Sequence, residues 1–344
     1  MTTPTEKKTD WRVFEGLAPD IDNDVYHSFE KTGAYSSSQL KKILDDPEIF
    51  YKTYISKEIP KEENSAFDIG TYFHTSILEP HKVATECMVY NGIRRGAEWE
   101  AFKAKNKGKV IINPKEYVDV QTLCKGIHES PIAMDLLKGI TAEESCFVTL
   151  HIGGDGNIYH RQSNGQVRKL TTDGWSPSFA ILTDETLYPL RFKVRADGRK
   201  PNVILDLKST SGNCRDAKDV IKKIEQLDYD LSAAFYIDLF TLFAKEGEAP
   251  YEFYWLFSSK SAPMAQSYVA SEETIKIGRA KYAQAIRLIA KNELNGWKFQ
   301  DTLVRAKPST YSISDWGNPT ITTLFDEIKK YEETIKSANV ADEL

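Results

Sequence analysis

The chain has 344 residues, of which 41% are apolar and 28% are charged, so it can bury the core of one large α/β domain or of two ordinary ones. No apolar run approaches the ~18–20 residues that a membrane span needs, and the N-terminus lacks the apolar segment of a secretory signal. We therefore expect a cytoplasmic protein without membrane contact. The net charge of −5 disfavours a protein that coats nucleic acid nonspecifically, unless its basic residues gather in one channel.

The cysteines are spread over the chain without any C-x-x-C pair: Cys87, Cys124, Cys146 and Cys214. This spacing disfavours a structural zinc site and a disulfide framework. We expect inert, reduced thiols, and an iron–sulfur site built by all four is the less favoured alternative.

The first part of the chain is predicted to be mainly helical. Residues 1–25 are polar and are predicted to form a flexible arm. A helix is predicted to begin at Ser36–Ser38, where a serine side chain can cap free backbone N–H groups, and a second helix covers about 65–78. Residues 94–109 are locally basic, and residues 114–140 have the pattern of one or two more helices.

After about residue 140 the pattern changes to β structure, because β-branched and aromatic residues dominate and turn signals separate short segments. The sequence predicts strands at about 146–152, 190–196, 203–208 and 253–258, one or two hairpins over 158–190, and helices at about 214–226, 229–245 and 271–293. The helix pair between the strands 203–208 and 253–258 is long enough for a crossover connection. We therefore predict an α/β fold with a mixed central sheet flanked by helices.

The same pattern predicts three parts of the chain. The arm at 1–25 is followed by one domain at 26–300, which carries a hairpin insertion at about 151–192. The tail at 301–344 is predicted to contain a short helix at about 320–336.

The chemically informative segment places Asp197 before the strand that carries Asp206 and Lys208, with eight residues between Asp197 and Asp206. Because side chains alternate across a strand, Asp206 and Lys208 project from one face. Two carboxylates can share a hard cation such as Mg²⁺, and a lysine can hold an attacking water and offset charge that builds on a phosphate.

The alternative is a hairpin with a surface salt bridge between Asp206 and Lys208, which explains most D-x-K sequences. Here Asp206 follows Val203-Ile-Leu205, which is typical of a buried strand. Burying a charged side chain there is costly unless it is paired or has a function. The same hairpin also carries cations that are suited to gripping phosphate: Lys193, Arg195 and Arg199. The segment is therefore predicted to form a catalytic site that acts on a nucleic acid.

The arrangement D-(x8)-D-L-K at Asp197 to Lys208 resembles the core motif of the PD-(D/E)xK nuclease superfamily. Other segments are similar, in the same order, to the RecE-like (exodeoxyribonuclease VIII) phage exonucleases: Ser36-x-Ser38-x-Leu40, Gly70-x-x-x-His74-x-x-x-Leu78-Glu79-Pro80, Arg94-Arg95 and Ala142-Glu143-Glu144-Ser145. Each match is weak alone, but their common order over about residues 26–295 makes a strong signal. The resemblance implies a PD-(D/E)xK exonuclease domain with a helical N-terminal part.

The resemblance also implies a ligand set for Mg²⁺, with Mn²⁺ as a substitute: His74, Asp197, Asp206 and the backbone carbonyl of Leu207. Without it, His74 on an apolar helix is more often a core residue. Glu143 is either a further carboxylate of the site or the solvated start of a strand. The family usually has Q-x-x-x-Y on the helix after the catalytic strand, whereas this chain has Ser232 with Tyr236, which puts the expected contact to substrate or metal-bound water in doubt.

Further residues are implied to contact DNA. Arg94 and Arg95 match a basic motif of the family, although such a run is usually a solvated face. Ser36 and Ser38 are predicted to cap a helix first and to contact phosphate second.

The function implied by the resemblance is a metal-dependent 5′→3′ exonuclease that acts on the ends of double-stranded DNA in a bacterial host cell. It would leave 3′ single strands for phage-type recombination by a single-strand annealing protein. The family implies a homo-oligomeric ring, whose predicted lumen gathers Arg94, Arg95, Lys193, Arg195 and Arg199. The alternatives are a RecB-type or other nuclease on the same core, and a catalytically silent DNA-binding recombination module.

Overall fold

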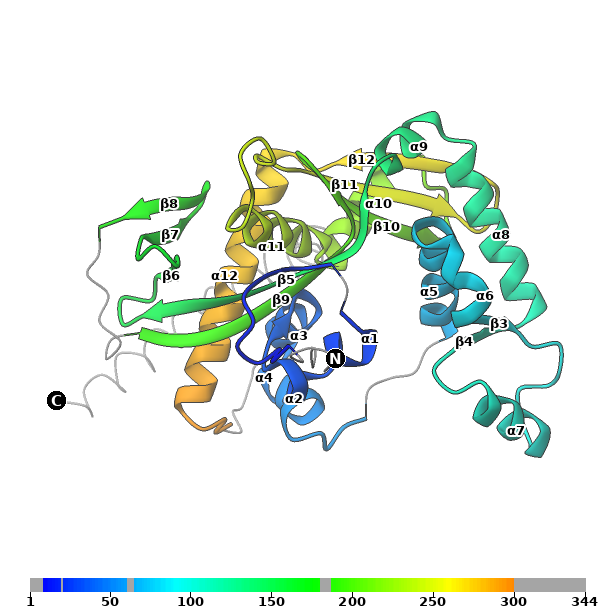
Figure 1. Ribbon diagram of the computed structural model, residues 1–344, viewed down its shortest axis with the longest axis horizontal. Helices are drawn as coiled ribbons and strands as arrows, with labels where there is room; N and C mark the ends of the chain where they lie inside the picture. The colour runs from blue at the N-terminus through cyan, green and yellow to red at the C-terminus, as the bar shows by residue number, and fades with distance from the viewer. Residues whose placement is uncertain (1–8, 20, 61–64, 180–186, 300–344) are drawn as a thin grey trace, which may run out of the picture. The chain divides into compact units, whose positions relative to one another are not determined.

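A computed structural model of the chain describes residues 9–19, 21–60, 65–179 and 187–299 (Figure 1). The elements below all lie within the compact unit that ends at Lys298. The predicted tail at 301–344 and its helix lie outside the described residues. None of the described helices is both long enough and apolar enough to cross a membrane.

Ten strands of the described residues form one mixed sheet, whose main path is β12-β11-β10-β9-β5-β6-β7-β8 (Figure 1). β1 and β2 join this path by pairing with β5 and β9. The strands are β1 (Gly16–Ala18), β2 (Tyr35–Ser36), β5 (Thr141–Gly153), β6 (Ile158–Arg161), β7 (Val167–Thr171), β8 (Gly174–Ser178), β9 (Leu187–Lys200), β10 (Val203–Thr210), β11 (Glu252–Ser259) and β12 (Ala265–Val269). A separate parallel pair consists of β3 (Cys87–Val89) and β4 (Val110–Ile112).

The helices of the first half are α1 (Asn23–Tyr26), α2 (Phe29–Thr32), α3 (Ser37–Asp45), α4 (Pro47–Phe50), the π-helix η1 (Tyr51–Ile55), α5 (Ser65–Leu78), the 3₁₀-helix η2 (Pro80–Lys82), α6 (Val83–Glu86), α7 (Ala97–Lys105), α8 (Pro114–His128) and α9 (Pro131–Leu137). Those of the second half are α10 (Ala217–Gln226), α11 (Tyr229–Thr241) and α12 (Glu272–Leu294). β10 and β11 are parallel, with α10 and α11 between them in the chain. This is the predicted crossover, and the predicted mixed α/β sheet is confirmed.

Helices cover both faces of the sheet. On one face, α3, α10, α11 and α12 pack on alternate residues of β9 and on Ile204 of β10. On the other face, α5 and α8 pack on Leu205 and Leu207 of β10 and on Leu256 of β11. β10 therefore contributes to two cores, because neighbouring side chains of a strand point to opposite faces.

The four cysteines are divided between these two cores. Cys146 and Cys214 belong to the core under α11 and α12, whereas Cys87 and Cys124 lie in or against the core under α5 and α8. All four thiols are free. The sheet separates the two pairs, so an iron–sulfur site that uses all four thiols is excluded.

The N-terminal segment is more ordered than the prediction of a loose arm at residues 1–25. Its described part contains β1, which pairs with β5 antiparallel, and the rings of Trp11 and Phe14 pack against the buried ring of Phe147. The prediction weighed polar composition and missed these two aromatic side chains, whose burial outweighs the cost of ordering a short segment.

The predicted hairpins between 158 and 190 are present in the described residues as β6, β7 and β8, which extend the sheet beyond β5. They are attached to the helices by Arg279 of α12, which donates to the carbonyl oxygen of Thr172 at 2.6 Å. The sequence pattern missed β12, a short strand after the turn that follows β11.

Candidate metal and catalytic site

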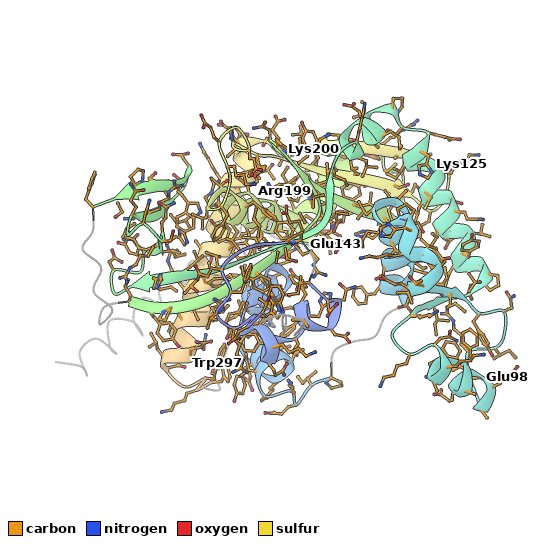
Figure 2. The ribbon with its side chains drawn as sticks, viewed as in Figure 1. Glu98, Lys125, Glu143, Arg199, Lys200 and Trp297 are labelled. Atoms are coloured by element: carbon orange, nitrogen blue, oxygen red, sulfur yellow. The ribbon has the colours of Figure 1, made fainter. Side chains whose placement is uncertain are left out.

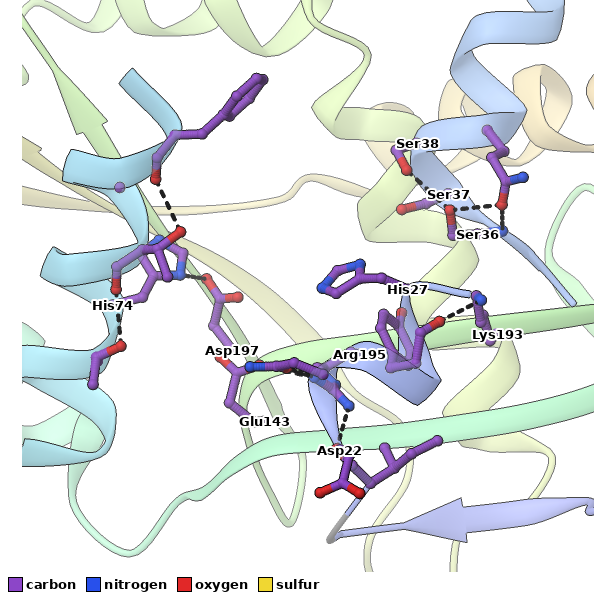
Figure 3. Close-up of a pocket in the computed structure, with 18 of the residues that line it drawn as sticks. Asp22, His27, Ser36, Ser37, Ser38, His74, Glu143, Lys193, Arg195 and Asp197 are labelled. Atoms are coloured by element: carbon purple, nitrogen blue, oxygen red, sulfur yellow. Dashed lines mark hydrogen bonds and ion pairs between the residues drawn. The ribbon is translucent and has the colours of Figure 1, made fainter. Parts of the chain in front are cut away.

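A pocket of about 1340 Å³ lies over β9 and β10, between α5 on one side and the N-terminal helices on the other (Figure 3). Its lining includes residues of α1, α2, α3, η1, α5 and α11. Among the predicted site residues, His74, Glu143, Asp197 and Lys208 line this pocket. The fold thus brings together residues from three segments that are distant in sequence: α5, β5 and the β9–β10 hairpin.

The pocket is built where β9 and β10 separate. The two strands pair only over Val203–Leu205, opposite residues 198–200, although β10 continues to Thr210 beside β11. Beyond that point the backbone N–H of Leu207 has no strand partner on the β9 side and instead donates to Asp197 Oδ2 at 2.6 Å. The strand predicted at about 190–196 extends further, because β9 continues to Lys200, and the carboxylate of Asp197 is therefore held inside the sheet.

His74 reaches this position from α5. Its Nε2 lies 2.8 Å from the carbonyl oxygen of Leu207, and its Nδ1 lies 3.5 Å from Asp197 Oδ2. The histidine therefore contacts both the carboxylate and the backbone carbonyl that were predicted to share a metal ion with it. A core histidine, the alternative raised by the sequence, would not be 27% exposed at a pocket.

Glu143 completes the group from β5. Its backbone adopts φ 53°, a left-handed conformation that is uncommon outside glycine, at the position opposite Asp197 where the β5–β9 register lacks a pair. Such a conformation costs on the order of 1–3 kcal/mol and often occurs at functional sites. The bend turns the Glu143 carboxylate into the pocket, where Figure 3 shows it beside Asp197. The reading of Glu143 as a solvated strand start does not fit this geometry.

The two pocket carboxylates lack full compensation. Burial and the neighbouring charge of Asp197 raise the pKa of Glu143 to about 8, against the opposing effect of Arg195, whose guanidinium lies 3.9 Å away. Burial also raises the pKa of Asp197, against the opposing effect of His74. Crowded, buried carboxylates with raised pKa values are typical of functional sites, where a cation resolves the repulsion.

The ligand atoms of His74, Glu143 and Asp197 all lie within 4.8 Å of one another. One nitrogen and two carboxylate oxygens at this spacing fit a divalent cation such as Mg²⁺ or Mn²⁺. Asp206, the other predicted ligand, lies next to this group and pairs with Lys208, Oδ1 to Nζ, at 2.5 Å. The residues present therefore fit a metal ion, with Glu143 in a more central place than the sequence suggested.

Lys208 lines the pocket while most of its side chain is buried. Burial lowers the pKa of its amine, but the charges of Asp206 and Asp197 more than reverse this effect and raise the pKa above its ordinary value. The lysine thus remains protonated and acts as a cation and hydrogen-bond donor.

Two of the cations predicted to grip DNA are structural. Lys193 is buried and donates to the carbonyl oxygen of Tyr26 and to Thr32 Oγ1. Arg199 is buried in an ion pair with Glu144 and donates to the hydroxyl of Tyr251 at 2.7 Å (Figure 2). These contacts argue against the predicted DNA contact: Arg199 does not line the pocket, and Lys193 lines it with an ammonium group that already binds Tyr26 and Thr32.

The other arginines predicted to contact DNA differ in how far they are already paired within the protein. Arg195 lines the pocket, but its guanidinium is bound to Ser145 and Asn23 and lies 4.0 Å from the centroid of the Tyr26 ring. Arg94 is paired with Glu116 at 2.6 Å. Arg95 is exposed at the surface.

The predicted serines cap α3 and also reach the pocket. Ser36 Oγ contacts Ser38 Oγ at 2.9 Å, and the backbone N–H of Ser36 donates to Gln39 Oε1, which closes a capping box (Figure 3). Both serines line the pocket.

The pair predicted on α11 is corrected in part. Tyr236 lines the pocket, but Ser232 is buried and does not. Tyr229, seven residues before Tyr236, lines the pocket instead. The sequence analysis missed Tyr229, although residues separated by seven share a helix face and the spacing from Tyr236 was available as a signal.

Comparisons with known proteins agree with this geometry. Residues 161–296 match the family model described as PDDEXK-like domain of unknown function (DUF3799), a range that includes Asp197, Asp206 and Lys208. The solved structure of a "Putative exonuclease" from Eubacterium rectale is similar, with 14% sequence identity, a TM-score of 0.50, and coverage of 85% of this chain and 97% of that chain. The chain has the PD-(D/E)xK nuclease fold.

Two other comparisons add no argument. The structure of SSO0001 has 11% sequence identity and a TM-score of 0.21 over 63% of this chain and 86% of that chain, a likeness too low to use. No curated protein is significantly similar to the chain in sequence.

Proposed function

We propose that the chain is a metal-dependent nuclease that hydrolyses phosphodiester bonds in DNA. The observation that carries this proposal is the group formed by His74, Glu143 and Asp197, with ligand atoms within 4.8 Å of one another, beside the Asp206–Lys208 pair. The PD-(D/E)xK fold supports it, because the matched range contains the two aspartates and the lysine.

Each residue has a defined task in this proposal. His74, Glu143, Asp197 and Asp206 would hold the metal ion, together with the carbonyl of Leu207. When bound, a divalent ion polarises the phosphate and lowers the pKa of a bound water. Lys208 orients the attacking water and offsets the negative charge that builds on the phosphate, since its amine remains protonated. Asp206 holds the Lys208 ammonium at 2.5 Å and so fixes its direction.

At a finer level, we propose a 5′→3′ exonuclease that acts on double-stranded DNA ends and leaves 3′ single strands, with Mg²⁺ as cofactor and Mn²⁺ as a substitute. Support comes from the resemblance of the segments around Ser36, Gly70 and Glu143 to the RecE-like exonucleases. A homo-oligomeric ring and a single-strand annealing partner remain part of this proposal. A lumen lined by Lys193 and Arg199 is withdrawn from it, because both cations are buried in one protomer.

The decisive experiment uses linear duplex DNA that is labelled at either the 5′ or the 3′ end. We expect Mg²⁺-dependent release of 5′-labelled nucleotides, no release with EDTA, and no cleavage of covalently closed circles. Nicking of circles would favour another nuclease on the same core. DNA binding without any cleavage would favour the catalytically silent module.

A further inference from the structure

The aromatic ring of Tyr229 contacts both the catalytic lysine and a second lysine that the proposed mechanism does not use. Lys208 Nζ and Lys41 Nζ each lie 4.9 Å from the centroid of this ring. A protonated amine within about 6 Å of an aromatic centroid is attracted by the electron-rich face of the ring. Tyr229 is therefore an interaction partner of both ammonium groups.

Lys41 has a second contact, with the backbone before α11. It lies on α3, and its Nζ donates to the carbonyl oxygen of Leu227 at 3.0 Å, just before α11 begins at Tyr229. Burial and the charge of Lys208 lower the pKa of Lys41 to about 8. The two ammonium groups thus repel each other, and the carbonyl contact anchors the Lys41 amine near the start of α11.

The ring itself, and not the hydroxyl, makes the contacts of Tyr229. Within the part of the chain that the structure describes, the Tyr229 hydroxyl has no hydrogen-bond partner, whereas the ring faces both lysines and lies 6.5 Å from the ring of Phe257. The side chain also forms part of the pocket wall beside Lys208 and Ser209. A phenylalanine at this position would keep every one of these ring contacts.

The Tyr229 ring is important for Lys208 because Asp206, the other partner of the Lys208 ammonium, is also a proposed metal ligand. Asp206 binds the ammonium at 2.5 Å, but the proposed mechanism also uses its carboxylate to hold the metal ion. An aromatic ring is neutral and does not bind hard cations, so it can hold the ammonium without competing for the metal.

We propose that Tyr229 and Lys41 are positioning residues for Lys208: the Tyr229 ring holds the Lys208 ammonium, and the Lys41 charge directs it toward the pocket. This inference rests on the proposed nuclease function for its kinetic consequence. The placement of Lys208 by the ring is a property of the protein alone and is testable without activity.

The kinetic experiment compares Tyr229→Phe with Tyr229→Leu on linear duplex DNA with Mg²⁺. We expect Tyr229→Leu to lower kcat about tenfold with KM unchanged, because an interaction with the reacting group is lost while DNA binding remains. Tyr229→Phe should stay within about twofold of the parent, since the ring is retained. An equal loss in both variants, or a loss confined to KM, would show that the hydroxyl binds substrate and would overturn the proposal.

Lys41 has a matched control in its exposed neighbour Lys42, which pairs with Asp45 at the surface. Lys41→Met should lower kcat about threefold, Lys41→Arg should restore it, and Lys42→Met should leave it unchanged. If Lys42→Met lowers kcat as much as Lys41→Met, the effect belongs to the general charge of α3 and the role of Lys41 is rejected.

A second readout does not depend on activity. Reductive methylation with formaldehyde and borohydride, followed by mass spectrometry of peptides, measures the reactivity of each lysine in the folded protein. We expect Lys208 to react several-fold faster in Tyr229→Leu than in the parent or in Tyr229→Phe, while Lys42 reacts equally in all three. Unchanged reactivity of Lys208 in a Tyr229→Leu protein with a normal Tm would refute the positioning role, even if the protein proves to be no nuclease.

Discussion

Two groups of buried charges, one around Asp238 and one in the pocket, differ in how their carboxylates are compensated. Asp238 of α11 is 3% exposed, and burial raises the pKa of its carboxyl. Burial likewise raises the pKa values of Glu143 and Asp197 in the pocket. A buried acid with a shifted pKa is thus common to both places and does not by itself identify a functional site.

The difference lies in how fully each carboxylate is satisfied. Both oxygens of Asp238 accept hydrogen bonds from Arg279, at 2.7 and 2.9 Å, and one also accepts from the hydroxyl of Tyr282 at 2.5 Å. Within the described residues, Glu143 accepts no hydrogen bond, and Asp197 accepts one from the backbone of Leu207. The Asp238 group therefore stabilises the fold, while the pocket group retains free lone pairs for a cation.

The largest expected effect follows from removing either member of the Asp206–Lys208 pair. Asp206→Ala and Lys208→Ala should each lower DNA cleavage by about a thousandfold or more, because charge stabilisation in the transition state is lost. The Tm should fall only modestly, since Lys208 lines the open pocket and keeps some contact with solvent without its partner. End-labelled duplex measures the first quantity and thermal unfolding the second. Normal activity in either folded variant would remove these residues from the active site.

The complementary test removes the Asp238 carboxylate, whose two oxygens both accept hydrogen bonds. Asp238→Ala leaves Arg279 buried without its partner and should lower the free energy of unfolding by about 3–5 kcal/mol. Cleavage by the remaining folded protein should be nearly normal and should need the same metal concentration. Asp238→Leu combined with Arg279→Met should recover much of the lost stability. If the double variant is less stable than Asp238→Ala, the group contributes more than charge compensation.

A smaller effect is expected from His74. The His74→Ala protein should need at least roughly tenfold more Mg²⁺ or Mn²⁺ for half-maximal cleavage, because one ligand is missing. Titration of the metal at constant DNA concentration measures this requirement. A lower Tm combined with an unchanged metal requirement would instead assign His74 to packing.

The smallest effect concerns the pH dependence of stability without metal. The folded protein keeps a proton on Glu143 up to about pH 8, whereas the unfolded chain loses it near the ordinary value of 4.5. The folded state thus binds more protons in this window, and its stability should fall as the pH rises from about 5 to about 8. Saturating Mg²⁺ should weaken this dependence, because metal binding releases the proton.

Thermal unfolding in EDTA across this pH range measures the effect, and Glu143→Gln is the control that should flatten it. An unchanged slope in Glu143→Gln would transfer the pH dependence to other groups of the protein.

Much of the fold could be predicted from local patterns in the sequence. The helix at 65–78, the strands around Asp206 and Phe253, and the crossover between them follow from hydrophobic periodicity and turn signals, which act over a few residues. β1 and β12 could not be predicted in this way, because short strands are stabilised by the partner strand and carry little pattern of their own.

The candidate site also has features that local sequence predicts and others that depend on tertiary packing. The sequence by itself determined that Asp206 and Lys208 share a strand face, because side-chain alternation is a local property of the backbone. Only the tertiary structure decided that Glu143 bends into the pocket and that Tyr229 faces Lys208. It also decided that Lys193 and Arg199 bind polar partners inside the fold. These outcomes depend on which distant segments meet when β5, β9, β10 and α11 pack. Burial and partner choice are set by that packing, and local sequence does not encode them.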